Sequence, residues 1–181
     1  MNRACQVLAM GWVVCVCGLL WGQQSPSTDP PSGQEAATNT EKIVRTVEEW
    51  RKLLTRHQFR VLRLKATEPP FRNKYDRHFE PGVYTCAGCD RELFASETKF
   101  DSGCGWPAFY AAKAGDRVIL TPDYSHGTVR TEVLCARCDS HLGHVFPDAP
   151  QTPTGERFCI NSAALKFIPA QPEKPPAPKK R

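Results

Sequence analysis

Cys86-Ala87-Gly88-Cys89 is the stretch that best explains how this chain is organised, because Cys135-Ala136-Arg137-Cys138 repeats its pattern later in the sequence. A Cys-x-x-Cys turn can direct two sulfur atoms toward one tetrahedral metal ion, and two such turns supply four thiolates. Four thiolates leave no open coordination position. We therefore predict a structural metal that joins two distant hairpin-like turns of one sheet, the alternatives being four unrelated thiols or two disulfides.

Two histidines follow the second cysteine pair and offer a different kind of metal site. His141 and His144 form a His-x-x-His pair, which could hold a catalytic metal. The cysteine set already saturates a tetrahedral ion, and this favours the structural site. Iron also accepts four sulfur ligands, so the sequence leaves the identity of the ion open.

The overall composition fits one globular domain with unstructured ends. The chain has 181 residues, of which 40% are hydrophobic, and many of its 16 prolines lie near the two termini. This length is enough for one domain plus tails. The formal net charge is +5, but the leader and the tail hold the excess, so the middle of the chain is close to balanced. A mild excess of this kind does not indicate a nucleic-acid-binding protein.

The two ends of the chain differ in character from the middle. Residues 1–22 combine a positively charged start with a short apolar run, which predicts an export signal. The run is short for a membrane span, although an uncleaved anchor is the alternative because no Ala-x-Ala site is present. We predict a disordered linker at 23–41, an exported (periplasmic or extracytoplasmic) domain at 42–168, and a Pro/Lys-rich disordered tail at 169–181.

Two capping boxes predict two short helices ahead of a β-rich region. Thr46 pairs with Glu49, and Thr55 with Gln58, so that side chain and backbone can satisfy exposed amides reciprocally. Pro69-Pro70 is expected to stop the helices, and residues 71–81 to form a loop. Apolar residues then recur with period two, which predicts short antiparallel strands at 83–85, 117–121 (ended by Pro122), 128–134, 145–146, 157–161 and 164–168.

Cys104 and Cys159 are the two cysteines of the predicted domain that the metal site does not use. Cys104 lies between two glycines, where the backbone is flexible. Cys159 follows Arg157 in an alternating stretch that places Asn161 on the same face. A nearby arginine or histidine can lower the pKa of a thiol and make it a nucleophile. Two buried apolar side chains, or one structural disulfide, are the alternatives.

Four longer motifs resemble those of the B-type peptide methionine-R-sulfoxide reductases, and the similarity runs from about residue 50 to about residue 167. The motifs are Gly103-Cys104-Gly105-Trp106-Pro107-Ala108-Phe109-Tyr110, Val129-Arg130-Thr131-Glu132-Val133, His141-Leu142-Gly143-His144-Val145-Phe146 and Arg157-Phe158-Cys159-Ile160-Asn161-Ser162-Ala163-Ala164-Leu165. Ala108 stands where the family usually has Ser, and Phe158 where Tyr is common. Both departures affect local hydrogen bonding and leave the nucleophile in place.

The resemblance implies a mainly β fold, with two antiparallel sheets forming a compact β-rich domain and small helices at its N-terminal side. It also implies a structural zinc ion. Its ligands would be the four paired cysteines, Cys86, Cys89, Cys135 and Cys138.

The resemblance further assigns roles in the site. It makes Cys159 the nucleophile and Cys104 the resolving thiol. The polar wall of the site would consist of His141, His144 and Asn161. The substrate-binding side would consist of Trp106, which takes the substrate methyl group, Arg157 and Phe158.

These residue types support reduction of a sulfoxide. A Cys159 thiolate can attack the sulfoxide sulfur while an imidazolium, for which His144 is the best candidate, gives the leaving oxygen a proton. The resulting sulfenic acid can condense with Cys104 to a disulfide, which a thioredoxin-like dithiol would reduce. We expect a monomer that binds no nucleic acid. The rival classes are a zinc-ribbon interaction module and a Cys-His hydrolase, which would need no Cys104.

Overall fold

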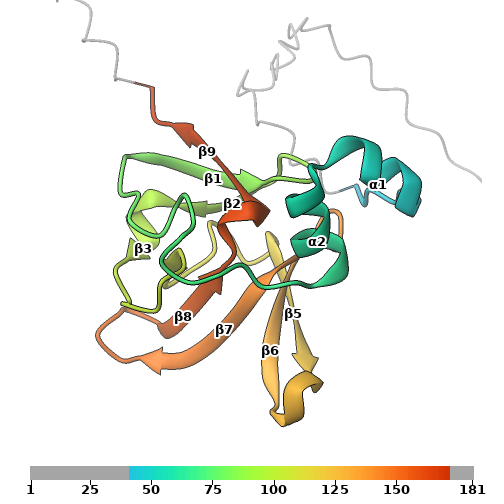
Figure 1. The fold of residues 1–181 in the computed structure, drawn as a ribbon. Coiled ribbons are helices and arrows are strands. Elements are labelled where there is room, and N and C mark those ends of the chain that lie inside the picture. The colour runs from blue at the N-terminus through green and yellow to red at the C-terminus, as the bar shows by residue number, and fades with distance from the viewer. Residues whose placement is uncertain (1–40, 172–181) are drawn as a thin grey trace, which may run out of the picture. The chain divides into compact units, whose positions relative to one another are not determined.

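Two short helices open the described part of the chain, which comprises residues 41–171 in this computed structural model (Figure 1). α1 (Val47–Leu53) and α2 (Arg56–Leu64) begin at the two predicted capping boxes, where a threonine hydroxyl accepts a hydrogen bond from the amide three residues later. α2 ends at Lys65, whose backbone is left-handed at φ 55°. The helix therefore stops before Pro69-Pro70, and the prolines are not its immediate terminator.

The predicted leader (1–22), nearly all of the linker (23–41) and most of the tail (169–181) lie outside the described residues. Between residues 41 and 171, no helix has the length and apolar character needed to cross a membrane.

A three-stranded antiparallel sheet brings the two ends of the strand region together. Its order is β2-β1-β9, formed by β2 (Glu92–Ala95), β1 (Gly82–Cys86) and β9 (Leu165–Pro169). The last strand returns to pair with the first, with Gly82 opposite Pro169. This pairing closes the domain, as the ribbon in Figure 1 shows.

A six-stranded antiparallel sheet carries most of the predicted site. Its order is β3-β4-β8-β7-β6-β5. The strands are β3 (Lys99–Phe100), β4 (Ala108–Phe109), β5 (Val118–Asp123), β6 (Arg130–Cys135), β7 (His141–Ala149) and β8 (Gly155–Ile160). Single turns of 3₁₀ helix follow β2, β5 and β8: η1 (Ser96–Thr98), η2 (Ser125–Gly127) and η3 (Ser162–Ala164). The mainly β fold with two antiparallel sheets is thereby confirmed.

The core lies between the two sheets and under the helices. Phe94 of the small sheet stacks on Phe109 of the large sheet, with ring centroids 4.5 Å apart, and Tyr84 meets the same ring edge-on at 5.1 Å. Burial of each such ring stabilises the fold by about 1.5–3 kcal/mol. The helices add Trp50, Phe59 and Leu62 to this cluster. Because α2 also contacts β7 and η3, it supports the strands that carry the site.

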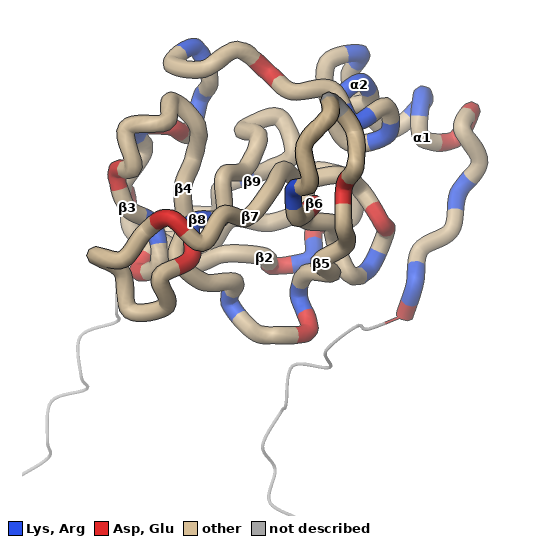
Figure 2. Tube along the Cα trace, turned by 90° about the horizontal axis from the view of Figure 1, so that it is seen from below, with Lys and Arg blue, Asp and Glu red and all other residues tan. Residues whose placement is uncertain are grey.

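The outer face of the helices is charged: α1 carries both acidic and basic residues, and the charged residues of α2 are basic. Lys and Arg positions recur along α1 and α2 (Figure 2), and four of them are exposed: Arg51, Lys52, Arg56 and Arg60. The helices are therefore amphipathic, with an aromatic inner face and a charged outer face.

Strand boundaries differ from the prediction where tertiary position overrides local signals. β5 continues through Pro122 to Asp123, because β5 is an edge strand and the missing proline N–H needs no partner there. The strand predicted at 145–146 is the nine-residue β7. β2, β3 and β4, of four, two and two residues, were not predicted.

Candidate active site and metal centre

Four buried cysteine sulfur atoms come together at one point of the described structure. The Sγ atoms of Cys86, Cys89, Cys135 and Cys138 all lie within 4.8 Å of one another. The Cys86–Cys138 pair is 3.7 Å apart and the Cys89–Cys135 pair 3.5 Å. A tetrahedral ion with metal–sulfur bonds of about 2.3 Å requires sulfur–sulfur distances of about 3.8 Å. The four residues therefore fit a tetrahedral metal ion, as the sequence predicted.

The two cysteine turns belong to different sheets, which corrects the expectation that both lie in one. The first turn joins β1 to β2 in the three-stranded sheet, and the second joins β6 to β7 in the six-stranded sheet. Spacing along the chain does not reveal which strands pair, so the sequence could not separate these arrangements. An ion bound here connects the two sheets.

Each cysteine turn ends in an aspartate with left-handed backbone. The φ angle is 59° at Asp90 and 54° at Asp139. In both turns the aspartate amide donates to the carbonyl of the first cysteine at 2.9 Å. Aspartate tolerates this conformation better than most residues. The repeated pattern Cys-x-x-Cys-Asp is thus a signal for the turn shape that the sequence analysis overlooked.

The two remaining thiols lie close together at the centre of the large sheet. Cys159 is in β8, opposite Ala108 of β4 on one side and His144 of β7 on the other. The Cys104 Sγ, in the loop before β4, is 3.6 Å from the Cys159 Sγ. A disulfide bond is about 2.05 Å long, so closing it requires only a short approach of the sulfurs. The expected mobility of Cys104 is therefore not needed to bring the thiols together.

A hydrogen bond joins the two thiols and shifts their pKa values in opposite directions. Hydrogen bonds from Cys159 and from the hydroxyl of Ser102, 2.9 Å from the Cys104 Sγ, lower the pKa of Cys104 to about 5. The hydrogen bond with Cys104 and burial raise the pKa of Cys159, while the guanidinium of Arg157 lowers it. A thiolate is therefore present in this pair at neutral pH.

Cys159 lines a cavity of about 120 Å³. Three of the other lining residues were predicted as site residues, namely Trp106, His144 and Asn161. Four further lining residues were not predicted as site residues: Thr67, Arg130, Gly143 and Phe146. The cavity thus combines a nucleophile, an imidazole and two aromatic rings.

His144 is oriented by a carboxylate that the sequence analysis did not identify. Its Nε2 lies 2.7 Å from an oxygen of Asp123, and the same oxygen accepts a 2.7 Å hydrogen bond from Arg130. Hydrogen bonds from Ser125, and then from His144, hold the pKa of Asp123 well below its usual range. An ionised Asp123 fixes a proton on Nε2. The Nδ1 atom is then the ring nitrogen left for chemistry in the cavity.

His141 lies next to His144, with ring centroids 5.5 Å apart, but does not line the cavity. Its Nδ1 is 2.7 Å from Glu132, whose other oxygen is 2.8 Å from the Lys65 ammonium. Burial lowers the pKa of His141, so the ring is neutral and donates through Nδ1 to the carboxylate. Its buried Nε2 has no hydrogen-bond partner among residues 41–171. His141 is thereby available as an acceptor at the back of the site.

Phe158 was expected beside the substrate, and its position corrects that expectation. Its side chain is buried in the core, where its ring centroid is 5.8 Å from that of Phe94, and it does not line the cavity. The reason is the alternation of side chains along β8. Because Cys159 faces the cavity, its neighbour Phe158 faces the opposite side.

Arg157 supports the cavity from outside. Its guanidinium forms a two-point ion pair with Asp148, at 2.8 and 2.6 Å. The same group lies 4.6 Å from the ring centroid of Phe146, which lines the cavity. Arg157 therefore fixes an aromatic wall and supplies positive charge near Cys159, but it is not itself a lining residue.

One loop residue, Glu68, holds two of the predicted site residues through its backbone. The indole Nε1 of Trp106 donates to the Glu68 carbonyl at 2.9 Å. The Oδ1 atom of Asn161 accepts from the Glu68 amide at 3.1 Å, and its Nδ2 donates to the Leu142 carbonyl at 3.0 Å. Both polar atoms of the Asn161 side-chain amide thus bind backbone groups, and these two hydrogen bonds hold the cavity wall in place.

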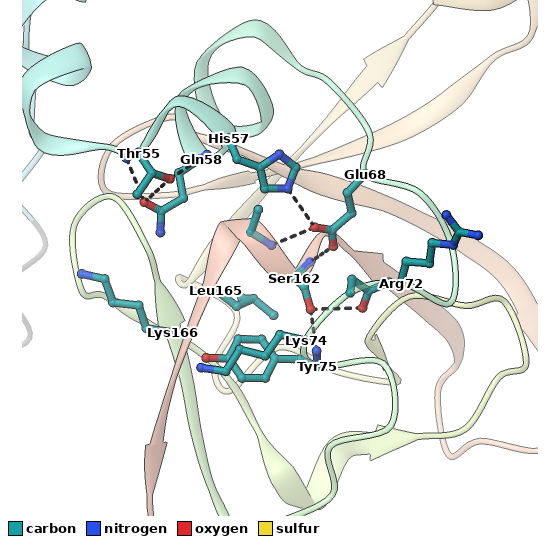
Figure 3. Close-up of a pocket in the computed structure, with 12 residues that line it drawn as sticks. Thr55, His57, Gln58, Glu68, Arg72, Lys74, Tyr75, Ser162, Leu165 and Lys166 are labelled. Atoms are coloured by element: carbon teal, nitrogen blue, oxygen red, sulfur yellow. Dashed lines mark hydrogen bonds and ion pairs between the residues drawn. The ribbon is translucent and has the colours of Figure 1, made fainter.

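A larger cavity, of about 460 Å³, lies beside α2 and η3 (Figure 3). Its lining includes His57, Glu68, Tyr75 and Ser162 but no cysteine. Because it offers no thiol, the reactive site is the smaller cavity that contains Cys159.

The carboxylates that orient the site were the main omission of the sequence analysis. Asp123, Glu132 and Asp148 each bind a basic side chain at the site: Asp123 binds Arg130 and His144, Glu132 binds the neutral His141 ring, and Asp148 binds Arg157. Glu132 lies within one of the motifs that carry the family resemblance, which was a usable signal. Asp123 meets His144 across β6, the strand that separates them, and no local spacing indicates such a contact.

Comparisons with known proteins agree with this geometry. The family model described as the SelR domain matches residues 54–169. A peptide methionine sulfoxide reductase MsrB of Pseudomonas syringae pv. syringae (strain B728a) is 56% identical over 129 residues, which cover 71% of this chain and 98% of the relative. The protein of the same name from Pseudomonas putida (strain W619) is 57% identical over 129 residues, covering 71% and 96%. That from Bradyrhizobium diazoefficiens is 54% identical over 132 residues, covering 73% and 94%. The chain therefore belongs to the SelR-domain family of B-type methionine-R-sulfoxide reductases, a family of oxidoreductases.

Proposed function

We propose that this protein reduces methionine-R-sulfoxide in peptides or proteins to methionine. The observation that carries the proposal is the placement of Cys159 in a small cavity with Trp106 and His144, while Cys104 lies 3.6 Å from it. The relatives named peptide methionine sulfoxide reductase support the same substrate.

The first step is attack of the Cys159 thiolate on the sulfoxide sulfur. Cys159 passes its proton to the Cys104 sulfur across the hydrogen bond between them. The Arg157 guanidinium favours the negative charge that this transfer leaves on Cys159. The sulfur–oxygen bond of the substrate breaks, the oxygen is transferred to Cys159 with one proton, and methionine leaves as a thioether. The substrate sulfur gains two electrons and Cys159 becomes a sulfenic acid. The Trp106 ring would form the apolar wall that receives the substrate methyl group.

His144 is the proposed acid for the departing oxygen. Asp123 binds its Nε2, so the proton would be delivered from Nδ1, the nitrogen of the cavity-lining ring that Asp123 leaves free. The neutral His141 ring and the braced Asn161 amide complete the polar wall.

The second step regenerates the enzyme through Cys104. Its sulfur attacks the sulfenic acid of Cys159, a disulfide forms and water leaves. An external dithiol then reduces the disulfide, and we propose a thioredoxin-like protein for this role. The 3.6 Å separation of the sulfurs supports an intramolecular disulfide over a long-lived sulfenic acid.

We propose zinc as the ion held by Cys86, Cys89, Cys135 and Cys138, because four buried thiolates at these spacings suit its tetrahedral preference. The ion would stabilise the junction of the sheets and take part in no chemical step. The apolar start of the sequence supports our further proposal that the protein is exported and acts outside the cytoplasm. We also propose that it acts as a monomer.

The experiment that tests the function is turnover of the two separated sulfoxide epimers of a methionine-containing peptide, with a chemical dithiol as reductant. We expect reduction of the R epimer and little reduction of the S epimer. Equal turnover of both epimers would remove the stereochemical assignment, and no turnover of either would favour a zinc-ribbon interaction module.

Variants of the two thiols test the proposed mechanism. Cys159→Ser should release no methionine, because a hydroxyl cannot form the sulfenic intermediate. Cys104→Ser should still release one equivalent in a single turnover, yet fail in thioredoxin-coupled turnover because no Cys104–Cys159 disulfide forms. A Cys104→Ser rate equal to that of the parent in the coupled assay would exclude Cys104 as the resolving residue.

A further inference from the structure

Glu68 lies between the small cavity of Cys159 and the larger cavity beside α2 and η3. Its neighbour Thr67 lines the small cavity with Cys159, and Glu68 itself lines the larger cavity shown in Figure 3. Only 5% of Glu68 is exposed to solvent. Glutamate is rarely buried to this extent unless its carboxylate is paired, so we expect the Glu68 carboxylate to bind specific partners.

The Glu68 carboxylate ties this loop to the chain that follows the catalytic strand. One oxygen accepts a hydrogen bond from the amide of Ser162, and the other accepts from the amide of Ala163 at 3.2 Å. Both amides belong to η3, which begins directly after Asn161. The imidazole of His57 lies 3.6 Å from the second oxygen, on the side of the larger cavity (Figure 3). The side chain thus fixes the loop in place relative to η3.

The backbone of the same residue reaches the opposite way, into the reductase site. Its carbonyl accepts from the Trp106 indole at 2.9 Å, and its amide donates to the Asn161 side chain at 3.1 Å. Trp106 and Asn161 come from segments far apart in the sequence, and both line the cavity of Cys159. Any displacement of Glu68 is therefore transmitted to two walls of that cavity.

Burial disfavours the charged form of the Glu68 carboxylate in the fold. Burial raises the pKa of Glu68 despite the hydrogen bonds from Ser162, Ala163 and His57. The ionised form is consequently less favourable in the fold than in the unfolded chain at neutral pH. A buried carboxylate whose charge is disfavoured, and whose residue binds two cavity side chains through its backbone, points to a functional constraint.

We propose that Glu68 is a positioning residue of the reductase site. Its carboxylate clamps the loop to η3, and its backbone thereby sets the places of the Trp106 ring and the Asn161 amide around Cys159. This inference rests on the proposed reduction of methionine-R-sulfoxide at that cavity.

Glu68→Gln is the direct test, because the amide has the same shape but turns one hydrogen-bond acceptor into a donor facing a backbone N–H. We expect kcat/KM for a methionine-R-sulfoxide peptide to fall about 10-fold, the loss expected for a site residue displaced by a fraction of an ångström. The melting temperature should change little. Glu49→Gln is the matched control, since it makes the same carboxylate-to-amide change at a glutamate that accepts a backbone hydrogen bond, at the start of α1 and away from the cavity. It should keep the parent kcat/KM.

A double-mutant cycle with Trp106→Phe separates positioning from a general effect on the fold. Phenylalanine lacks the ring N–H that reaches the Glu68 carbonyl, so the link is already absent in that background. We expect Glu68→Gln to lower kcat/KM less than about 3-fold there, because coupled residues show non-additive effects. Losses that simply multiply would overturn the inference, since Glu68 would then act independently of Trp106.

Two further controls keep the outcome interpretable. If Glu68→Gln is unfolded at the assay temperature, Glu68→Asp takes its place in the same cycle, with the same expected non-additivity. The parent is assayed first on the R epimer. An inactive parent contradicts the proposed function itself, whereas an active parent with an equally active Glu68→Gln variant contradicts the positioning role alone.

Discussion

Gly143→Ala should damage the protein at the point where β7 passes closest to the catalytic strand. A Cβ atom added at Gly143 would lie 2.1 Å from the carbonyl oxygen of Cys159 and 3.0 Å from the Cα of Ile160. Non-bonded carbon atoms settle at about 3.5–4 Å, so β7 and β8 would have to separate by roughly 1 Å. Both strands are central in the six-stranded sheet, which leaves no edge toward which the displacement can relax.

The expected cost follows from this overlap. Overpacking a close-packed site costs about 1–3 kcal/mol, and weakening a neighbouring ladder hydrogen bond adds about 1 kcal/mol. A total of about 3 kcal/mol should lower the melting temperature by about 10 °C for a domain of this size. A shift of about 1 Å at the nucleophile should also reduce kcat/KM about 100-fold.

Circular dichroism during thermal unfolding measures the loss of stability. Turnover of the R epimer, assayed well below the melting temperature, measures the loss of kcat/KM. Gly115→Ala is the matched control, because a Cβ atom there would meet nothing within 4 Å. The reasoning is wrong if Gly143→Ala melts within about 2 °C of Gly115→Ala, which is less than 1 kcal/mol would produce.

Three more predictions concern the metal site and the titrating groups. Cys86→Ser should lose both bound metal and thermal stability, whereas Cys104→Ser should keep a full equivalent of metal by elemental analysis; a metal-replete, normally melting Cys86→Ser would show that Cys86 is not a ligand. Because burial lowers the pKa of His141, the unfolded chain takes up a proton below about pH 6.5 that the fold resists. The melting temperature should therefore fall as pH drops from 7 to 5, less steeply in His141→Gln, and equal slopes in parent and variant would contradict this. The reduced protein should show thiolate absorbance at 240 nm with a midpoint near pH 5 that Cys104→Ser abolishes, since the pKa of Cys104 is lowered to about 5; a midpoint unchanged by the variant would assign the signal elsewhere.

Features encoded by neighbouring residues were the ones that the sequence could predict. The capping boxes at Thr46 and Thr55 are complete within four residues, and both helices begin there. Each half of the candidate metal site is likewise a short turn, so the four cysteines that come together could be predicted from the spacing within each turn. Cys104 and Cys159 stood out as the two cysteines of the predicted domain outside the metal site, and the resemblance supplied their roles; their sulfur atoms do lie together.

Features that depend on strand pairing could not be predicted from the sequence. The cysteine turns were assigned to one sheet because chain spacing carries no information on which strands are neighbours. The Asp123–His144 contact spans three strands of a sheet, and the bonds from Glu68 to Trp106 and Asn161 join segments far apart in the sequence. Phe158 was misplaced for a simpler reason: a motif names adjacent residues, but alternate residues of a strand face opposite sides.

The division of the metal site between two sheets has a consequence for the order of assembly. Neither sheet alone offers more than two sulfur ligands, so tight chelation must wait until both hairpins have formed and met. Occupancy of the site then reports docking of the sheets. Any fluctuation that pulls them apart lowers the affinity for the ion, so release of metal to a coloured chelator should time the first large opening of the domain. In an oxidising or metal-poor environment, where the thiolate ligands or the ion are lost, the same junction is where the domain should begin to come apart.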